Sequence, residues 1–184
     1  SAMMLAVSMM FLRFMILILI FSTSIFLNIY PYLLIMSATA AGIGIFIHKK
    51  HTIKGEREVI EETETESNPL EFKVALIFAL LFVVFTFLTH YTLVYAGTGG
   101  LSILSIATGL SDITPFILNL LQGGNIPATI VGACIMQAII SNIVVNMFYA
   151  IFFSSRRKEM LPYVWKGFLT VIGVNAVLLL IYYF

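Results

Sequence analysis

Six long apolar segments divide this sequence, and they constrain its fold more than any other feature. A helix needs about 20 apolar residues to cross the hydrocarbon core of a bilayer, and several segments reach that length. In chain order they are residues 3–28, 32–47, 74–95, 101–121, 126–153 and 163–184. A soluble domain rarely needs one such run, so the sequence predicts an all-α fold, a polytopic bundle of transmembrane helices.

The composition agrees with a chain that lives in lipid. Hydrophobic residues make up 60% of the 184 residues and charged residues only 10%, whereas a typical soluble domain carries about 25% charged residues. The net charge of +1 provides no field that would attract nucleic acid. The one cysteine, Cys134, lies in an apolar segment and is expected to pack as a small hydrophobe. The expected surroundings are the lipid bilayer, with no nucleic-acid partner.

The charged residues divide the chain into three regions. Residues 1–48 are expected to form a two-helix transmembrane hairpin with its turn at Tyr30-Pro31. Residues 49–73 contain most of the charged side chains and are predicted to be a solvated linker. Residues 74–184 form the second transmembrane half.

Basic residues predict how the segments cross the membrane. Lys and Arg in short loops remain cytoplasmic, which places the linker 49–73 and the loop 154–158 on the cytoplasmic side. An even number of crossings must then separate these two regions. Three apolar segments lie between them, so one of the three should not cross.

Residues 101–121 are the segment that is expected not to cross. Gly109, Asp112 and Pro115 interrupt it within seven residues, and such a break can end one half-helix and start another. We therefore predict five full spans plus a re-entrant hairpin that dips in from outside. The alternative is a kinked sixth span, with the basic-residue rule broken once.

Asp112 is the only acidic residue within any apolar segment. A charge at membrane depth costs a few kcal/mol even on mild scales, so it marks a site by default. The break around it would free backbone groups able to hold an ion or substrate, which also makes Asp112 the candidate metal ligand. Ser111 or Thr114 could cap the second half-helix. The plainer interpretation is that Asp112 itself only caps that half-helix.

Arg13 is the other charge that lies deep within a span. Asp112 is the only carboxylate within the spans that could lower its cost, which suggests a buried Arg13–Asp112 pair. The alternative is that the long side chain of Arg13 reaches the headgroups.

A polar stripe runs along segment 126–153, at helical spacings of four or five residues. It consists of Gln137, Ser141, Asn142 and Asn146. Such side chains often join helices by hydrogen bonds, and the alternative is that they line a cavity facing Asp112. Asn119 is similarly ambiguous between packing and binding. No catalytic constellation or zinc-ligand cluster stands out, so we expect neither an enzyme nor a cofactor.

Several short strings resemble one known family. They are NPLEFK at 68–73, SIATGLSD at 105–112, PAT at 127–129, SN at 141–142 and MMFLR at 9–13. Together they are similar to the C-terminal membrane domain of unknown function in MgtC/SapB-type proteins, over essentially the whole chain. Proteins of that group are described as magnesium or other cation transporters, or as regulators of ion homeostasis.

The chain departs from this family pattern at two positions. The pattern often has a second acid where this chain has Thr114, and a lysine where it has Asn146, which weakens a specific claim for a divalent cation. The family domain also begins further upstream, so this chain resembles its later part. Two halves with three crossings each would be inverted repeats, with residues 3–47 corresponding to 126–184.

The sequence thus predicts a transporter-like or channel-like protein of a bacterial inner membrane, as a homo-oligomer with a dimer favoured. It would move a small ion, with a cation favoured, or a solute past Asp112. The other hypothesis is a non-transporting regulator of ion homeostasis that binds another membrane protein.

Overall fold

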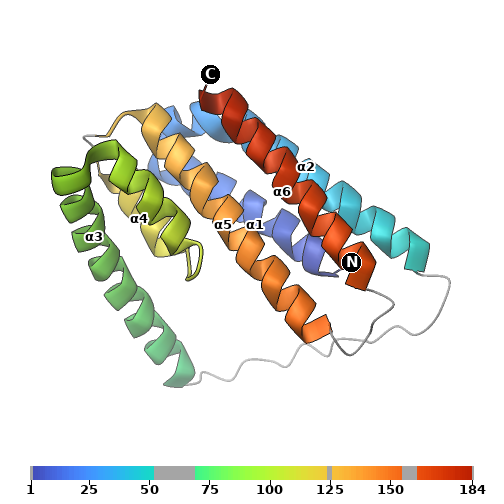
Figure 1. Ribbon diagram of the computed structural model, residues 1–184. Helices are drawn as coiled ribbons and strands as arrows, with labels where there is room; N and C mark the ends of the chain where they lie inside the picture. The colour runs from blue at the N-terminus through green and yellow to red at the C-terminus, as the bar shows by residue number, and fades with distance from the viewer. Residues whose placement is uncertain (1, 52–68, 124–125, 155–160, 184) are drawn as a thin grey trace.

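The computed structural model describes residues 2–51, 69–123, 126–154 and 161–183. Over these ranges the chain forms six helices and no strand (Figure 1). The helices are α1 (Ala2–Phe21), α2 (Thr23–His51), α3 (Pro69–Thr108), α4 (Thr114–Gln122), α5 (Ala128–Ser154) and α6 (Leu161–Tyr183). All but α4 are long and apolar enough to cross a membrane. The predicted all-α membrane bundle is confirmed.

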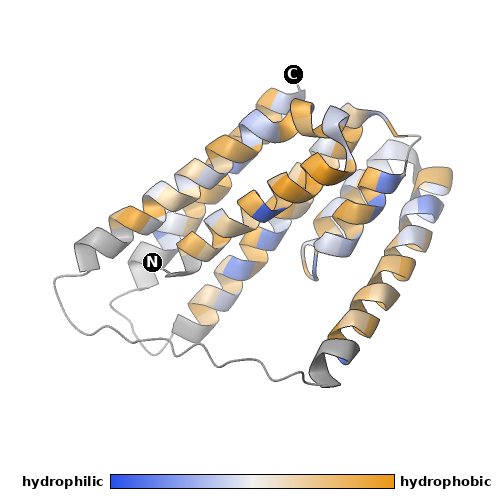
Figure 2. Cartoon of the chain, turned by 180° about the vertical axis from the view of Figure 1, so that it is seen from behind, coloured by the Kyte–Doolittle hydropathy of each residue, from blue (hydrophilic) through white to orange (hydrophobic). Residues whose placement is uncertain are grey.

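The surface of the bundle is suited to lipid. Figure 2 shows apolar residues along every helix, and large hydrophobic side chains are exposed on all the long ones, such as Ile16, Phe87 and Phe152. A soluble protein rarely exposes so much contiguous apolar surface. The exposed residues therefore face hydrocarbon, while the buried ones join the helices.

The first hairpin turns at Ser22, so the predicted turn at Tyr30-Pro31 is wrong. The Ser22 hydroxyl accepts a hydrogen bond from the Ile25 amide at 3.4 Å and caps the start of α2. Pro31 lies inside α2, because neighbouring helices in a membrane can compensate for the hydrogen bond that a proline removes. Buried hydroxyls join the two helices, since Ser8 donates to the Ser37 carbonyl at 3.2 Å.

α3 reverses direction at Gly97. This residue has φ 60° and ψ −152°, a conformation open to glycine because it has no Cβ. The helical arm of residues 98–108 then runs back beside α4, which returns toward the level of the kink (Figure 1). Residues 101–121 therefore lie in a helical hairpin broken between Thr108 and Thr114, as the interruption predicted. That this hairpin is re-entrant and replaces a sixth crossing stays a prediction.

The tip of this hairpin lies against the middle of α5. The Ser141 hydroxyl donates to the Ile106 backbone carbonyl at 2.7 Å, and the side-chain Nδ2 of Asn142 donates to the Gly109 backbone carbonyl at 3.3 Å. Both donors are near the centre of the 27-residue α5. If α5 spans the bilayer, the break between the arm and α4 lies at mid-depth.

α5 packs against four other helices, namely α2, α3, α4 and α6. A methyl group at Gly132 would collide with Ile29 of α2 and Tyr182 of α6, so this glycine lets three helices approach closely. Figure 1 shows that α5 runs opposite to α1, and α6 opposite to α2. These directions are the ones that inverted repeats would have, and the repeat itself stays a prediction.

The helix ends next to both charged regions lie at one end of the bundle. In Figure 1 the ends of α2 and α5 and the starts of α3 and α6 are all near its lower edge. The predicted linker 49–73 and loop 154–158 fall mostly outside the described residues. Their flanking helices agree with the expectation that both regions share one side of the membrane.

Cysteine labelling tests the re-entrant topology. In a Cys134→Ala background, Thr98→Cys and Gly123→Cys should react with a membrane-impermeant maleimide from one face, and Lys73→Cys from the other. All three native residues are exposed. Labelling in right-side-out and inverted vesicles measures the sidedness. A sixth crossing would instead put Gly123→Cys on the same face as Lys73→Cys.

Candidate functional site

The tip of the hairpin begins where the helical arm tightens and stops. The amides of Gly109, Leu110 and Ser111 each donate to a carbonyl three residues earlier, at 3.0 to 3.2 Å, which is the pattern of a 3₁₀ turn. The Ser111 hydroxyl also donates to the Thr108 carbonyl at 3.2 Å. These local hydrogen bonds provide partners for the last backbone carbonyls of the arm, and the chain then turns at Asp112.

The Asp112 carboxylate binds Thr114, the first residue of α4, while the N-cap position, Ile113, has no capping side chain. Its Oδ1 accepts hydrogen bonds from the Thr114 amide at 2.9 Å and from the Thr114 hydroxyl at 2.7 Å. Pro115 occupies the first turn, where its missing N–H costs nothing. Ser111 and Thr114, the expected caps, do not cap α4. A carboxylate is the stronger acceptor and also complements the positive end of the helix dipole.

Arg13 approaches this cap from the middle of α1. Its Nη2 donates to the Thr114 hydroxyl oxygen at 3.5 Å, and that hydroxyl donates to Asp112. The expected pairing of Arg13 with Asp112 therefore takes a different form, with Thr114 between the two charges. Thr114 is buried, while Arg13 and Asp112 are exposed on the single chain.

α5 supplies the neutral side of the site. The side-chain Nδ2 of Asn146 donates to the side-chain Oδ1 of Asn142 at 3.1 Å, and the Nδ2 of Asn142 donates to the Gly109 backbone carbonyl. Asn146 also lines a cavity of about 220 Å³ together with Met10 of α1 and Phe168 of α6. A line of amides thus leads from this cavity to the tip of the hairpin.

Two residues predicted to share the site lie elsewhere. Gln137 donates to the Tyr183 hydroxyl of α6 at 3.0 Å, which is the helix-joining role weighed for the stripe. Asn119 donates to the Thr86 hydroxyl of α3 at 2.6 Å, at the far end of α4 from Asp112. The stripe from Gln137 to Asn146 looked continuous in the sequence, because spacing alone does not show which neighbouring helix each side chain meets.

Sequence reasoning missed the central position of Thr114 between two charges. The one available signal was its place two residues after an aspartate, where a threonine hydroxyl and amide can both turn back to the carboxylate. Nothing in the sequence pointed to Arg13 as the second partner of that hydroxyl.

The charged groups at the tip limit what it can hold. Among the described residues, no three His, Cys, Asp or Glu side chains gather as metal ligands. A cation at the tip would therefore meet one carboxylate, and its other ligands would be neutral oxygens from backbone, hydroxyl or amide groups. Ca²⁺ sites in proteins usually include several carboxylates, whereas Mg²⁺ is often bound by one or two carboxylates together with water.

The fold and this site define a class, a polytopic helical membrane protein with a broken helical hairpin that carries a carboxylate at its tip. Residues 1–154 match the family described as "Domain of unknown function (DUF4010)", and the chain belongs to that family.

A relative from Aquifex aeolicus (strain VF5), described as "Uncharacterized protein", is 24% identical over 153 residues. The match covers 82% of this chain and 63% of the relative, so the chain spans less than two thirds of that protein. No solved structure matches the chain.

Gly109 tests how closely the tip must approach α5. A methyl group there would collide with the Ser141 side chain and with the backbone nitrogen of Asn142. Gly109→Ala should lower the stability of the detergent-solubilised protein by about 1–3 kcal/mol, because the tip must move away. Thermal unfolding measures this. Gly173→Ala, with nothing within 4 Å, is the control, and equal midpoints for both variants would contradict the docking.

A double-mutant cycle tests the bridge between Arg13 and Thr114. Arg13→Gln and Thr114→Val should be coupled by about 0.5–1 kcal/mol, because each removes one partner of the same hydrogen bond. Unfolding free energies of the four proteins measure the coupling. Thr170→Val removes a hydroxyl that bonds only within α6, so its effect should add to that of Arg13→Gln. Additivity in the first cycle would argue against the bridge.

Proposed function

We propose that this chain is a transporter-like or channel-like membrane domain that passes a small ion, with a cation favoured, or a solute across the bilayer at Asp112. The observation that carries the proposal is the exposed carboxylate at the break of a hairpin docked on the middle of α5. The proposal is for a non-enzymatic protein.

Physical chemistry supports a wet path at this position. Irregular backbone and ionised side chains persist at membrane depth only where protein or water surrounds them. One carboxylate oxygen of Asp112 serves the cap through the Thr114 amide and hydroxyl. The other accepts no hydrogen bond within the described ranges and remains able to bind a ligand. Broken helices of this kind bind ions in known transporter folds.

The charges at the tip favour a monovalent cation or a proton over a divalent ion. Asp112 is a single acid, and Arg13 lies on the other side of the Thr114 hydroxyl, so its positive charge opposes a second one nearby. The resemblance to MgtC/SapB-type proteins supports a cation. The departure at Thr114 removes the second carboxylate that a divalent site would use.

A second copy of the chain would complete the surroundings of the tip. Arg13 and Asp112 are exposed on one chain, and facing lipid would cost each of them several kcal/mol. We therefore propose a homo-oligomer, with a dimer favoured, in a bacterial inner membrane. The linker 49–73 and the loop 154–158 would be cytoplasmic, and the passage would open by alternating access around the hairpin.

The same exposure supports a second candidate function. A different membrane protein could cover Asp112 and Ser111, which are both exposed, and the chain would then be a non-transporting regulator of ion homeostasis. The two candidates differ in what must be present for activity, since transport needs no other protein.

Flux into proteoliposomes separates them. The full chain should pass at least one of H⁺, Na⁺, K⁺ or Mg²⁺, and Asp112→Asn should reduce that flux about tenfold, which corresponds to roughly 1.4 kcal/mol at the barrier. Thr170→Val should keep the flux, because its hydroxyl bonds only within α6. Absence of flux for every ion, with co-purification of one specific membrane protein, would favour the regulator.

A further inference from the structure

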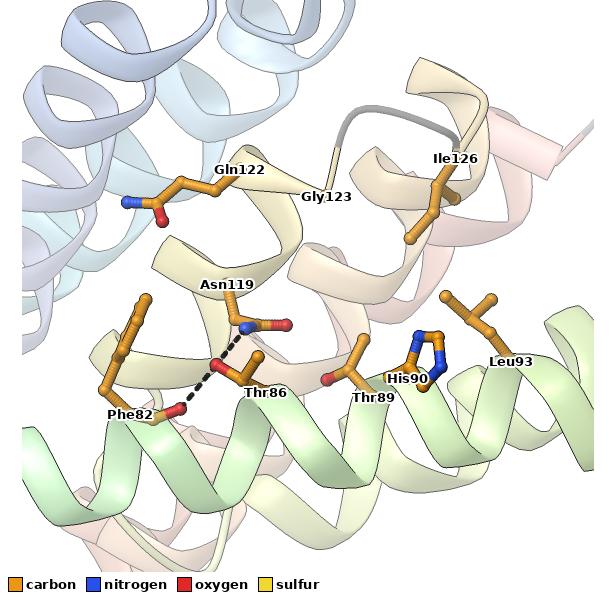
Figure 3. A pocket seen from close by; sticks show the side chains of 9 residues that line it. All are labelled: Phe82, Thr86, Thr89, His90, Leu93, Asn119, Gln122, Gly123 and Ile126. Carbon is orange, nitrogen blue, oxygen red and sulfur yellow. Dashed lines mark hydrogen bonds between the residues drawn. The ribbon is translucent and has the colours of Figure 1, made fainter.

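A second cavity lies between α3 and α4, toward the end of α4 that is far from Asp112. Its volume is about 390 Å³. Figure 3 shows its lining, with Asn119 reaching from α4 toward Thr86 and with Thr89 beside them on α3. The remaining lining residues are Phe82, His90, Leu93, Gln122, Gly123 and Ile126.

One side of this cavity is already organised by hydrogen bonds. The Thr86 hydroxyl donates to the Phe82 carbonyl at 2.8 Å and accepts from the Asn119 amide nitrogen at 2.6 Å. This arrangement fixes the orientation of the Asn119 side chain. Its carbonyl oxygen accepts no hydrogen bond from the part of the chain that the structure describes, and it is left to face the cavity.

Thr89 is the anomaly in this cavity. Its side chain is 4% exposed, and its hydroxyl is buried without any hydrogen-bond partner among the described residues. Threonines in helices usually return such a bond to the carbonyl four residues earlier, as Thr86 and Thr170 do here. A buried hydroxyl without a partner is costly, so its position on the cavity wall points to a missing ligand.

The lining also indicates the kind of ligand. Its described residues contribute hydroxyls, amides and one imidazole, and none of them is a carboxylate, lysine or arginine. Hydroxyls and amides both donate and accept hydrogen bonds, so together they complement a neutral molecule that does the same. Phe82, Leu93 and Ile126 offer apolar surface for the carbon part of such a molecule.

The cavity is separate from the tip of the hairpin. Phe85 of α3 and Phe116 of α4 are both buried and meet edge to face, with ring centroids 5.9 Å apart. Phe116 lies between Asn119 and Asp112 in the sequence, so this contact joins α3 to α4 nearer the tip. None of the cavity-lining residues belongs to the Asp112 site.

We propose that this cavity binds a small uncharged solute bearing amide or hydroxyl groups, held by the Thr89 hydroxyl and the side-chain Oδ1 of Asn119. This second site goes beyond the proposed ion passage and does not depend on it. Its binding can be measured without flux, so failure here would leave the Asp112 proposal standing.

Acetamide is the probe that tests the proposal. It should raise the unfolding temperature of the detergent-solubilised full chain in a saturable manner, because it binds only the folded state. Thr89→Val keeps the shape of the side chain and removes the hydroxyl, and it should weaken acetamide binding about tenfold. The ligand-free variant should unfold at or above the wild-type temperature, because an unpaired buried hydroxyl has been removed.

Two controls make the test specific. Sodium acetate has nearly the same shape as acetamide and carries a charge, and it should give no shift. Thr170→Val, which removes a hydroxyl outside the cavity, should keep the full acetamide response. The proposal is overturned if acetamide gives no shift with the wild type, if Thr89→Val responds equally, or if acetate binds as well as acetamide.

Discussion

The hairpin is held at its tip by hydrogen bonds from the middle of α5, and the rest of the site depends on this contact. The Asn142 side chain gives the Gly109 carbonyl a partner where water is scarce. The Ser141 hydroxyl adds a second hydrogen bond to the Ile106 carbonyl, which already accepts one from the Gly109 amide. Gly109 makes the contact possible because any larger residue would collide with Ser141. Without the contact between the tip and α5, the break in residues 101–121 would leave backbone polar groups without partners in an apolar environment.

The docked tip in turn explains how two charges coexist in an apolar bundle. Asp112 is stabilised by the amide and hydroxyl of Thr114 and by the positive end of α4. Arg13 shares the same hydroxyl from α1, so the two charges approach without forming a closed pair.

Much of the fold was predictable, and the errors have local physical causes. The helical hairpin followed from the break at Gly109, Asp112 and Pro115, and the parity that the basic regions impose predicted that it is re-entrant. The first turn was misplaced because Pro31 looks like a break, yet a membrane helix tolerates it, and the Ser22 hydroxyl caps α2 instead. Asn119 and Gln137 were grouped with Asp112 because polarity in a span signals a partner without identifying it.

The sequence by itself determined that this chain is a multi-pass helical membrane protein, because that property depends on the length of the apolar segments. It also predicted the number of crossings and which carboxylate lies within a span, from the positions of charges along the chain. The tertiary structure alone decided which polar groups meet. Thr114 came to lie between Arg13 and Asp112, 101 and two residues away, and Thr89 was left without a partner. Such relations arise from helices packing side by side, and no local pattern records which faces will touch.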